Sequence, residues 1–371
     1  MNVLFVLNPI SGTGRKKLIP RIIADNIDNS RFTYEICYTQ YKGHAREIAA
    51  EAAKNGVDIV VAVGGDGTVN EIGCGLINTD TAMAILPCGS GNGLARHLGI
   101  PTDLRKAVRI INECKIECLD YGMINDRPFF CTCGMGFDAF ISMEFAKSGK
   151  RGPVTYAEKI LKEWLTYKPQ TYIITDENNE QKHEALLVSC ANASQYGNNA
   201  YIAPCASMKD GVMDVVIMEP FNVLDAPYIG MDMFNKTLDR NNKIKTFRTS
   251  KLTIKREHEG VVHYDGEPLI MGKDINISII KGGINVVING SVQEDVLNSP
   301  NIIQSSLNEL SHNIQKIRLD FLKTTDEVLQ KVNLVKNLKE LKGIKDFKGL
   351  KDIRGIKDIK RLNNSKDEDH K

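Results

Sequence analysis

Long hydrophobic runs are missing from this chain of 371 residues. No apolar stretch approaches the roughly 20 residues that a helix needs to cross a bilayer. The first ten residues, MNVLFVLNPI, also lack the basic segment and apolar core of a secretory leader, and they have the pattern of a strand. We therefore expect neither a membrane-spanning segment nor a secretory signal.

A strong net charge is also missing, because 48 Lys and Arg are balanced by 46 Asp and Glu. Nucleic-acid-binding proteins usually carry a basic folded face, so we expect no nucleic-acid partner. The nine cysteines are odd in number and scattered, in a chain too long to need a disulfide framework. This usage predicts reduced thiols and a cytoplasmic protein.

The one strongly basic region is near the C-terminus. Residues 331–362 hold eleven Lys or Arg against four Asp or Glu, and they include three copies of a six-residue repeat at 342–359, KGIKDF, KGLKDI and RGIKDI. An apolar residue recurs at every third position of this region. Because an α-helix has 3.6 residues per turn, apolar side chains with this spacing would wind around the helix instead of following one face. Two interpretations stay open: a solvated extension, or an amphipathic basic segment that binds anionic membrane.

The rest of the chain has ordinary globular composition and a length that suggests two domains. Residues 1–122 alternate apolar runs with helical patterns, which predicts an α/β domain with a mostly parallel sheet. Residues 123–290 hold short β-rich runs separated by turns, which predicts a mostly antiparallel β-domain with an inserted helix at 157–167. We expect residues 291–330 to form a helix that packs back on the first domain, followed by the basic tail at 331–371.

A glycine-rich loop follows an apolar strand predicted at residues 58–63, in the sequence VVAVGGDGTVNEI. Ligands of parallel sheets bind at the carboxyl ends of the strands, and glycines there expose backbone N–H groups to a phosphate. We expect Thr68 to cap the following helix, whose N-terminus favours an anion. Asp66 would repel a phosphate unless it works with Mg²⁺, a hydroxyl or a lysine.

Two further small-residue loops follow the first and fourth strands of this sheet, NPISGTGR at 8–15 and PCGSGNG at 87–93. Neither the GxxxxGK[ST] phosphate loop nor the GxGxxG fingerprint is present. Because the carboxyl ends of parallel strands share one edge, the three loops together predict a nucleotide-binding site.

Six segments, in this order, resemble the diacylglycerol kinase and sphingosine kinase family: NPISG at 8–12, GGDGTVNE at 64–71, PCGSGNGLAR at 87–96, GFDA at 136–139, KDGVMDV at 209–215 and DGE at 265–267. The resemblance covers roughly residues 1–295. It implies a nucleotide-binding lobe of the NAD kinase and diacylglycerol kinase type, a β-sandwich second lobe, ATP in the cleft between them, and phosphorylation of a lipid hydroxyl.

The resemblance also implies roles for individual residues. The residues that match the family's ATP contacts are Asn8, Pro9, Ile10, Ser11, Gly12, Thr39, Gly64, Gly65, Asp66, Gly67, Thr68, Val69, Asn70 and Ser90. A magnesium site would be formed by Ser207, Asp210 and Val212, of which only Asp210 offers a carboxylate. Without the resemblance, Asp210-Gly211 and Asp265-Gly266 would be interpreted as turns, for which Asp-Gly is a favoured pair.

Glu267 matches the family's general base, and either Glu267 or Asp66 is chemically able to accept the hydroxyl proton. Asp138 lies near the position at which sphingosine kinases place an acid for the substrate headgroup. Ser90 and Gly93 depart from the bacterial diacylglycerol kinase pattern, which has Thr and Asp there, and GSGNGLA is closer to the sphingosine kinases. We therefore expect the lipid to be a sphingoid base or a diacylglycerol, and this loop favours the sphingoid base.

A lipid kinase without a membrane span must meet its substrate at the membrane surface, so we expect a peripheral membrane protein whose basic tail binds anionic lipid. The sequence is compatible with a monomer or a homodimer. Two alternatives stay open: a soluble nucleotide kinase of the NAD kinase type, and a non-catalytic membrane-binding module.

Overall fold

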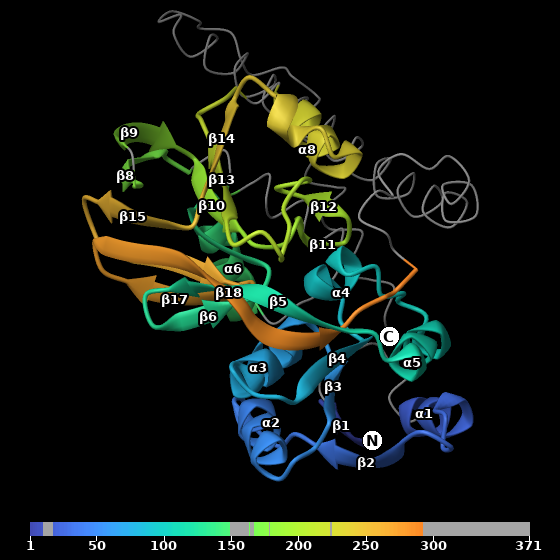
Figure 1. Ribbon diagram of the computed structural model, residues 1–371. Coiled ribbons are helices and arrows are strands. Elements are labelled where there is room, and N and C mark those ends of the chain that lie inside the picture. Colours follow the sequence, from blue (N-terminus) through green and yellow to red (C-terminus); the bar gives the residue numbers. More distant parts are fainter. Residues whose placement is uncertain (10–17, 149–162, 164–166, 178, 223–224, 292–371) are drawn as a thin grey trace, which may run out of the picture. The chain divides into compact units, whose positions relative to one another are not determined.

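The computed structural model describes residues 1–9, 18–148, 163, 167–177, 179–222 and 225–291 (Figure 1). The chain divides into two compact units, residues 1–314 and 315–371, and the second lies wholly outside the described residues. The helices predicted at 157–167 and 291–330 fall outside them too, apart from Glu163, Tyr167 and Ser291, and so does the tail at 331–371.

The first lobe is built on four parallel strands in the order β2-β1-β3-β4. Their bounds are β1 Asn2–Leu7, β2 Thr33–Tyr38, β3 Ile59–Gly64 and β4 Ala82–Pro87. Every residue of β3 and β4 is buried, because helices cover both faces of the sheet. The mostly parallel sheet predicted for this lobe is confirmed.

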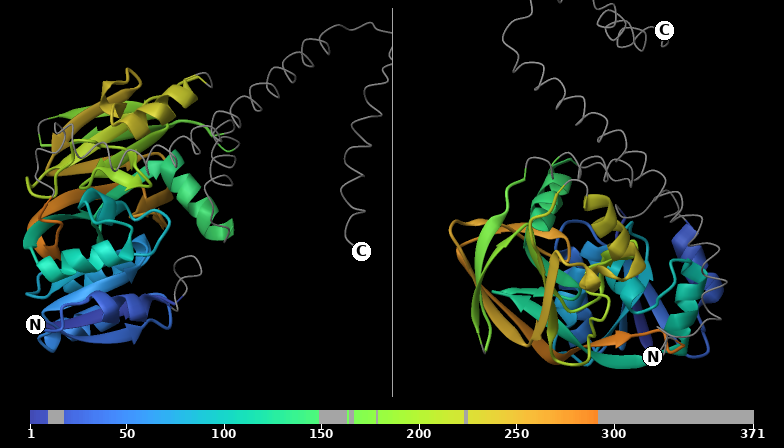
Figure 2. Two further views of the ribbon diagram at one scale, coloured as in Figure 1. Left: turned by 90° about the vertical axis from the view of Figure 1, so that its right-hand side faces the viewer. Right: turned by 90° about the horizontal axis from the view of Figure 1, so that it is seen from above.

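Two helices cover each face of this parallel sheet (Figure 1). On one side lie α2 (His44–Lys54) and α3 (Asp66–Leu76). On the other lie α1 (Ile19–Asn26) and α5 (Leu104–Glu113), which face the viewer in the left panel of Figure 2. The short helix α4 (Gly93–His97) follows β4. Helix α5 was not predicted from the sequence, although Asp103 caps it by accepting the N–H groups of Arg105 and Lys106.

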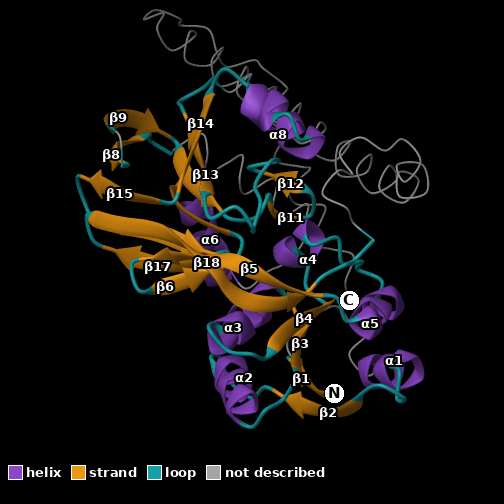
Figure 3. Ribbon diagram, viewed as in Figure 1, coloured by secondary structure: helices purple, strands orange, loops and turns teal. Residues whose placement is uncertain are grey.

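The second lobe is an antiparallel β-sandwich, as predicted (Figure 3). One layer is a six-stranded sheet in the order β14-β13-β10-β7-β16-β17. The bounds are β7 Thr132–Gly136, β10 Leu187–Ala191, β13 Met213–Met218, β14 Ile244–Thr249, β16 Gly260–Tyr264 and β17 Glu267–Met271.

The other layer of the sandwich continues the parallel sheet of the first lobe. Its strands are β5 Ile116–Ile124, β6 Arg127–Phe129, β8 Gln170–Thr175, β9 Glu180–Ala185, β15 Lys251–Arg256 and β18 Asp274–Val287. Strand β18 makes the connection, since its first half pairs antiparallel with β15 while Val286 pairs in parallel with Met83 of β4. One strand thus ties the two lobes together.

The remaining elements are β11 Gln195–Gly197, β12 Ala200–Tyr201, α6 Phe137–Ser148, α8 Ala226–Asn235 and a 3₁₀ turn at Leu238–Arg240. Helix α6 packs against β7, β16 and β17. Within the described part of the chain, no helix is both long enough and apolar enough to cross a membrane.

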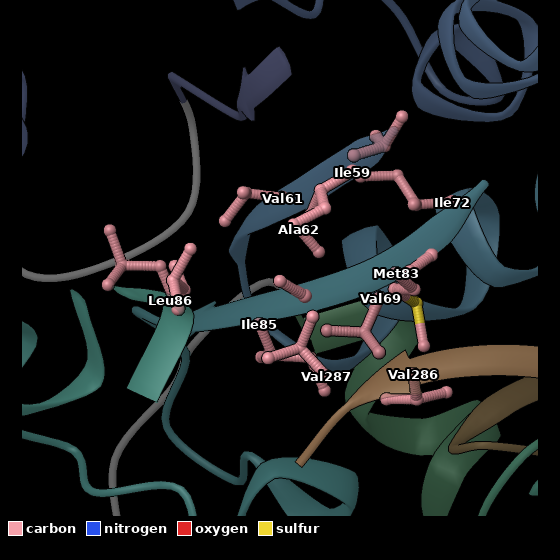
Figure 4. Close-up of a cluster of buried hydrophobic side chains, with 14 of the residues drawn as sticks. Ile59, Val61, Ala62, Val69, Ile72, Met83, Ile85, Leu86, Val286 and Val287 are labelled. Carbon is pink, nitrogen blue, oxygen red and sulfur yellow. The ribbon is translucent and has the colours of Figure 1, made fainter. Parts of the chain in front are cut away.

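Three hydrophobic cores lie within the described residues, and two of them meet strand β18. The core of the first lobe fills the space around β3 and β4, where Val69 and Ile72 of α3 pack on the sheet and Val286 and Val287 of β18 join them (Figure 4). A second core lies between the two layers of the sandwich and draws on β5 to β10, β13 and β15 to β18. Because β18 contributes residues to both of these cores, it joins the packing of the first lobe to that of the second.

Candidate active site

The glycine loop after β3 opens directly into helix α3. Gly65 precedes the helix in an extended conformation, and α3 begins at Asp66. The predicted capping role of Thr68 is wrong, because the helix begins two residues earlier and its N-cap, Gly65, has no side chain to make a capping hydrogen bond. The Thr68 hydroxyl instead accepts a hydrogen bond from Asn8 Nδ2 at 3.2 Å. This bond joins the end of β1 to the first turn of α3.

The Asp66 carboxylate is directed into the loop between β4 and α4. It accepts the backbone N–H groups of Asn92 at 2.9 Å and Gly93 at 2.6 Å. Burial raises the pKa of Asp66, although these two hydrogen bonds act in the opposite direction. A Cβ atom at Gly91 would stand 2.7 Å from Asp66 Oδ2, so the loop passes too close for a side chain. Asp66 therefore fastens the two glycine loops together.

The two glycine loops also meet backbone to backbone. A Cβ atom at Gly89 would stand 2.5 Å from the Cα of Gly65. Asn92 closes its own loop, since its side chain accepts from Gly89 N at 2.9 Å and donates to Gly89 O at 2.8 Å. Ser90 is exposed at the tip of this loop. Two of the three predicted loops therefore lie side by side at the carboxyl edge of the sheet.

The remaining predicted nucleotide contacts are distributed as follows. Asn8 and Pro9 are described, whereas Ile10, Ser11 and Gly12 of the first loop lie outside the described residues. Thr39 is buried just after β2, where its N–H donates to Leu7 O at 3.0 Å. All of these described positions lie at the carboxyl ends of parallel strands, as nucleotide binding requires.

The Asp265-Gly266 turn connects β16 to β17 and brings the second lobe to α3. Both residues have positive φ, 47° and 81°, as a two-residue hairpin turn of this type demands. The partly buried Asp265 carboxylate accepts hydrogen bonds from Asn70 Nδ2 at 2.8 Å and from three backbone N–H groups, those of Phe130, Cys131 and Thr132. Burial raises the pKa of Asp265. The interpretation as a turn is confirmed, and this aspartate also fixes the hairpin against Asn70.

Glu267 follows this turn and lies over the first turn of α3. A Cβ atom at Gly67 would stand 3.4 Å from Glu267 Oε1. The other carboxylate oxygen, Oε2, accepts a hydrogen bond from Lys42 Nζ at 2.7 Å. The side chain of Glu267 is 36% exposed. The structure thus places the predicted base beside the glycine loop, with one oxygen directed at a position that has no side chain.

Lys42 is a residue of the site that the sequence did not predict. It lies in the loop between β2 and α2, and its pairing with Glu267 raises the pKa of the lysine. A single lysine in a polar loop carries no local signal, because its partner is 225 residues away in the sequence. Its place just before Gly43 and His44 in the segment YTQYKGHA was the only available hint.

The predicted magnesium turn at 207–212 makes contacts with a different set of residues. Asp210 forms an ion pair with Arg248, and Gly211 N donates to Asp120 Oδ2 at 2.7 Å. Among the described residues, no group of three or more His, Cys, Asp or Glu is arranged to hold a metal ion. The only carboxylate among Ser207, Asp210 and Val212 is thus engaged by the guanidinium of Arg248, and the other two residues would contribute backbone carbonyls. The magnesium role of this turn stays a prediction.

Asp138 lies in the first turn of α6 and belongs to a buried polar cluster. Tyr196 OH donates to Asp138 Oδ2 at 3.0 Å, and His263 Nε2 lies 3.0 Å from the same oxygen. His263 is 2% exposed, and its Nδ1 has no hydrogen-bond partner within the described part of the chain. His263 is on β16, the strand that leads to Glu267. The cluster therefore includes the strand that precedes the Asp265-Gly266 turn, and the substrate role of Asp138 stays a prediction.

Comparison with known proteins agrees with this geometry. Residues 2–124 match the diacylglycerol kinase catalytic domain, and residues 132–287 match the YegS C-terminal NAD kinase beta sandwich-like domain. The fold and the site thus define a two-lobe kinase, a transferase of phosphoryl groups. The chain belongs to the YegS-like lipid kinase family.

Individual relatives cover most of the chain. It is 30% identical over 289 residues to the probable lipid kinase YegS-like of Enterobacter sp. (strain 638), a match that spans 76% of this chain and 94% of that protein. The corresponding protein of Citrobacter koseri is 30% identical over 253 residues, with 66% of this chain and 83% of that protein covered. The crystal structure of a diacylglycerol kinase from Bacillus anthracis str. Sterne superimposes with a TM-score of 0.62 at 24% identity, over 79% of this chain and 98% of that chain. The resemblance stated from the sequence is confirmed.

Proposed function

We propose that this protein is an ATP-dependent lipid kinase that transfers the γ-phosphoryl group to a hydroxyl of a lipid. The observation that carries the proposal is the approach of Glu267 to Gly67, which sets a partly exposed carboxylate of one lobe beside the N-terminus of α3 in the other. A helix N-terminus favours a phosphate, and a carboxylate beside it is placed to accept a proton from an incoming alcohol.

In the proposed reaction, the chain binds the triphosphate and orients the alcohol. Backbone N–H groups at the start of α3 and the loop at 88–93 are the donors for the phosphates. The alcohol oxygen forms a bond to the γ-phosphorus while the bond from that phosphorus to the β,γ-bridging oxygen breaks, and the alcohol proton passes to Glu267. ADP and the phosphorylated lipid are the products. Magnesium enters with ATP as part of the substrate and neutralises phosphate charge.

Between the two predicted bases, the surroundings favour Glu267. Both oxygens of Asp66 already accept backbone N–H groups, and the residue is partly buried. A base needs a free oxygen within hydrogen-bond reach of the proton that it accepts. Asp66 therefore keeps its predicted place at the nucleotide, as the group that holds the loops, and Glu267 is the proposed base.

The proposed substrate class is a lipid alcohol, either a sphingoid base or a diacylglycerol. The match to the diacylglycerol kinase catalytic domain supports a diacylglycerol, whereas the segment GSGNGLA supports a sphingoid base. The two lipids differ in the headgroup, which carries a charged amine only in the sphingoid base. Asp138 is the acid that we propose to face such an amine.

A direct assay tests the function. Purified protein is incubated with γ-labelled ATP, Mg²⁺ and mixed micelles that contain diacylglycerol, sphingosine, dihydrosphingosine or ceramide, with soluble NAD in a separate reaction. We expect label in a lipid, and far less label with Glu267→Gln. Label in NAD and in no lipid would support the soluble nucleotide kinase instead. Absence of ATP binding by calorimetry would support the non-catalytic module.

The basic tail is the proposed contact with the membrane. Its excess of Lys and Arg at 331–362 suits an anionic lipid surface. Deletion of residues 331–371 is expected to weaken sedimentation with anionic vesicles while leaving turnover of a short-chain, soluble lipid nearly unchanged. Equal vesicle binding by the full chain and the deletion variant would contradict a membrane-binding role for the tail.

A further inference from the structure

The cation that contacts the proposed base comes from the opposite lobe. Lys42 Nζ lies 2.7 Å from Glu267 Oε2, and the lysine side chain is 82% exposed. An ion pair this exposed contributes little to folding stability, with a typical value below about 1 kcal/mol. The pair is therefore better explained by an effect on the reactivity of Glu267 than by an effect on the fold.

The loop that carries Lys42 is held in place by α3. Glu71 accepts the N–H groups of Gly43 at 2.9 Å and Ala45 at 3.2 Å through its two carboxylate oxygens. His44 Nδ1 accepts a hydrogen bond from Gln40 N at 3.0 Å, which joins the two ends of the short segment that contains Lys42. The same helix α3 presents Gly67 to Glu267. The backbone of the loop that carries Lys42 is thus fixed relative to the N-terminus of α3.

The hairpin that carries Glu267 is held equally firmly. Asp265 is two residues away and is fixed by Asn70 and three backbone N–H groups. With both supports fixed, the long side chains of Lys42 and Glu267 remain the adjustable part of the site. When Oε2 is held by Lys42, the rest of the carboxylate is turned so that Oε1 faces Gly67.

We infer that Lys42 is a positioning residue for the phosphoryl transfer, which holds Glu267 Oε2 and so directs the other carboxylate oxygen toward the N-terminus of α3. A hydrogen bond between charged groups is shorter and stronger than a neutral one, so it favours one orientation of the carboxylate. The inference rests on the proposed function, because it assigns Lys42 a role in the same reaction. The other charged or titratable groups near the pair are Tyr264, Glu71, Asp265 and Arg127.

The first test needs no substrate and so does not depend on the proposed activity. Side-chain carboxyl carbons are labelled with ¹³C, and the Glu267 signal is assigned by its loss in Glu267→Gln. We expect the chemical shift of this signal at neutral pH to change in Lys42→Met, which removes the hydrogen bond to Oε2, and to stay close to wild type in Lys42→Arg. An unchanged chemical shift in Lys42→Met would overturn the inference even if the protein proves to be a lipid kinase.

The second test is kinetic and uses a matched control. Lys54, an exposed lysine in the last turn of α2, is replaced in Lys54→Met, which should behave as wild type. Lys42→Met is expected to lower kcat about tenfold, because the carboxylate of the base is no longer held in one orientation. Lys42→Arg should restore most of the loss, while KM for ATP and the melting temperature stay close to wild type in all three.

Two kinetic outcomes would contradict a positioning role. A rise in KM for ATP with kcat unchanged would mean that Lys42 binds the nucleotide directly. A kcat that stays unchanged in Lys42→Met would mean that the ion pair has no part in the reaction. If no lipid is phosphorylated by the wild type, the proposed function fails, whereas the carboxyl signal still decides whether Lys42 holds the Glu267 carboxylate.

Discussion

The carboxylates of the site use the same chemical group in two opposite ways. Asp66 and Asp265 are partly buried, and all their oxygens are taken up by N–H donors. Glu267 is partly exposed, shares one oxygen with Lys42 and leaves the other facing Gly67. A carboxylate whose oxygens are all engaged serves as a structural fastener, whereas one with a free, solvent-accessible oxygen can take part in proton transfer.

Glu267→Gln should give the largest effect and test the partly exposed carboxylate directly. Loss of a general base lowers turnover by about 100-fold or more, which corresponds to roughly 3 kcal/mol in activation free energy. The free energy of unfolding should stay within about 0.5 kcal/mol, because the side chain is partly exposed and keeps its size. Labelled-ATP assays and urea unfolding measure the two quantities. Wild-type turnover in this variant would remove Glu267 from the mechanism.

His97, the last residue of α4, provides a test of how stability beside the loop at 88–93 depends on pH. Burial lowers the pKa of His97 to about 4, from an ordinary value of 6.5. The unfolded chain binds the proton more readily, so the free energy of unfolding should rise by about 3 kcal/mol as pH increases from about 4 to 6.5. Urea unfolding over this range should show a shallower rise in His97→Gln. The exposed His258→Gln is the control and should keep the wild-type slope.

Asp66→Asn should weaken the hydrogen bonds that join α3 to the loop at 88–93, with a smaller effect on stability. An amide that places NH₂ against a backbone N–H leaves a buried donor unsatisfied, at a cost of about 1–3 kcal/mol in stability. Because burial raises the pKa of Asp66, its contribution to stability falls as pH rises from 3.8 through the raised value, and this component should vanish in the variant. Denaturant unfolding at several pH values measures both effects. Full stability combined with lost turnover would instead favour Asp66 as the base.

Gly89→Ala should give the smallest of these effects. Its new Cβ would meet the Cα of Gly65, so the two loops must move apart, at a cost of about 1 kcal/mol. We expect a higher Kd for ATP by calorimetry. Gly272→Ala is the matched control, since a Cβ there has open space, and it should change neither stability nor ATP binding. Equal ATP binding by both variants would argue against a nucleotide between these loops.

Much of the fold and part of the site follow from local sequence. The apolar strands that end in glycine loops predicted the parallel sheet and its ligand edge, and Asp265-Gly266 predicted a tight turn. The tasks of the site's side chains were not predictable locally, because each depends on a distant partner. Asp66 acts on Asn92 and Gly93, and Lys42 acts on Glu267, contacts that exist only once the sheet and the hairpin have formed.

Helix α6 is a second feature that the sequence did not predict. Its apolar and polar residues do not separate onto two faces, so periodicity in the sequence gave no signal for it. The fold nevertheless uses its first turn to place Asp138 against His263. Tertiary packing, and not an amphipathic pattern, defines this element.

A crystal structure with a non-hydrolysable ATP analogue and Mg²⁺ tests the central claim most directly. We predict that the β- and γ-phosphates contact the backbone N–H groups at the start of α3 and in the loop at 88–93, with Glu267 Oε1 on the same side of the γ-phosphate as the entering alcohol. A nucleotide bound away from α3, or a Glu267 carboxylate directed away from the γ-phosphate, would contradict the account.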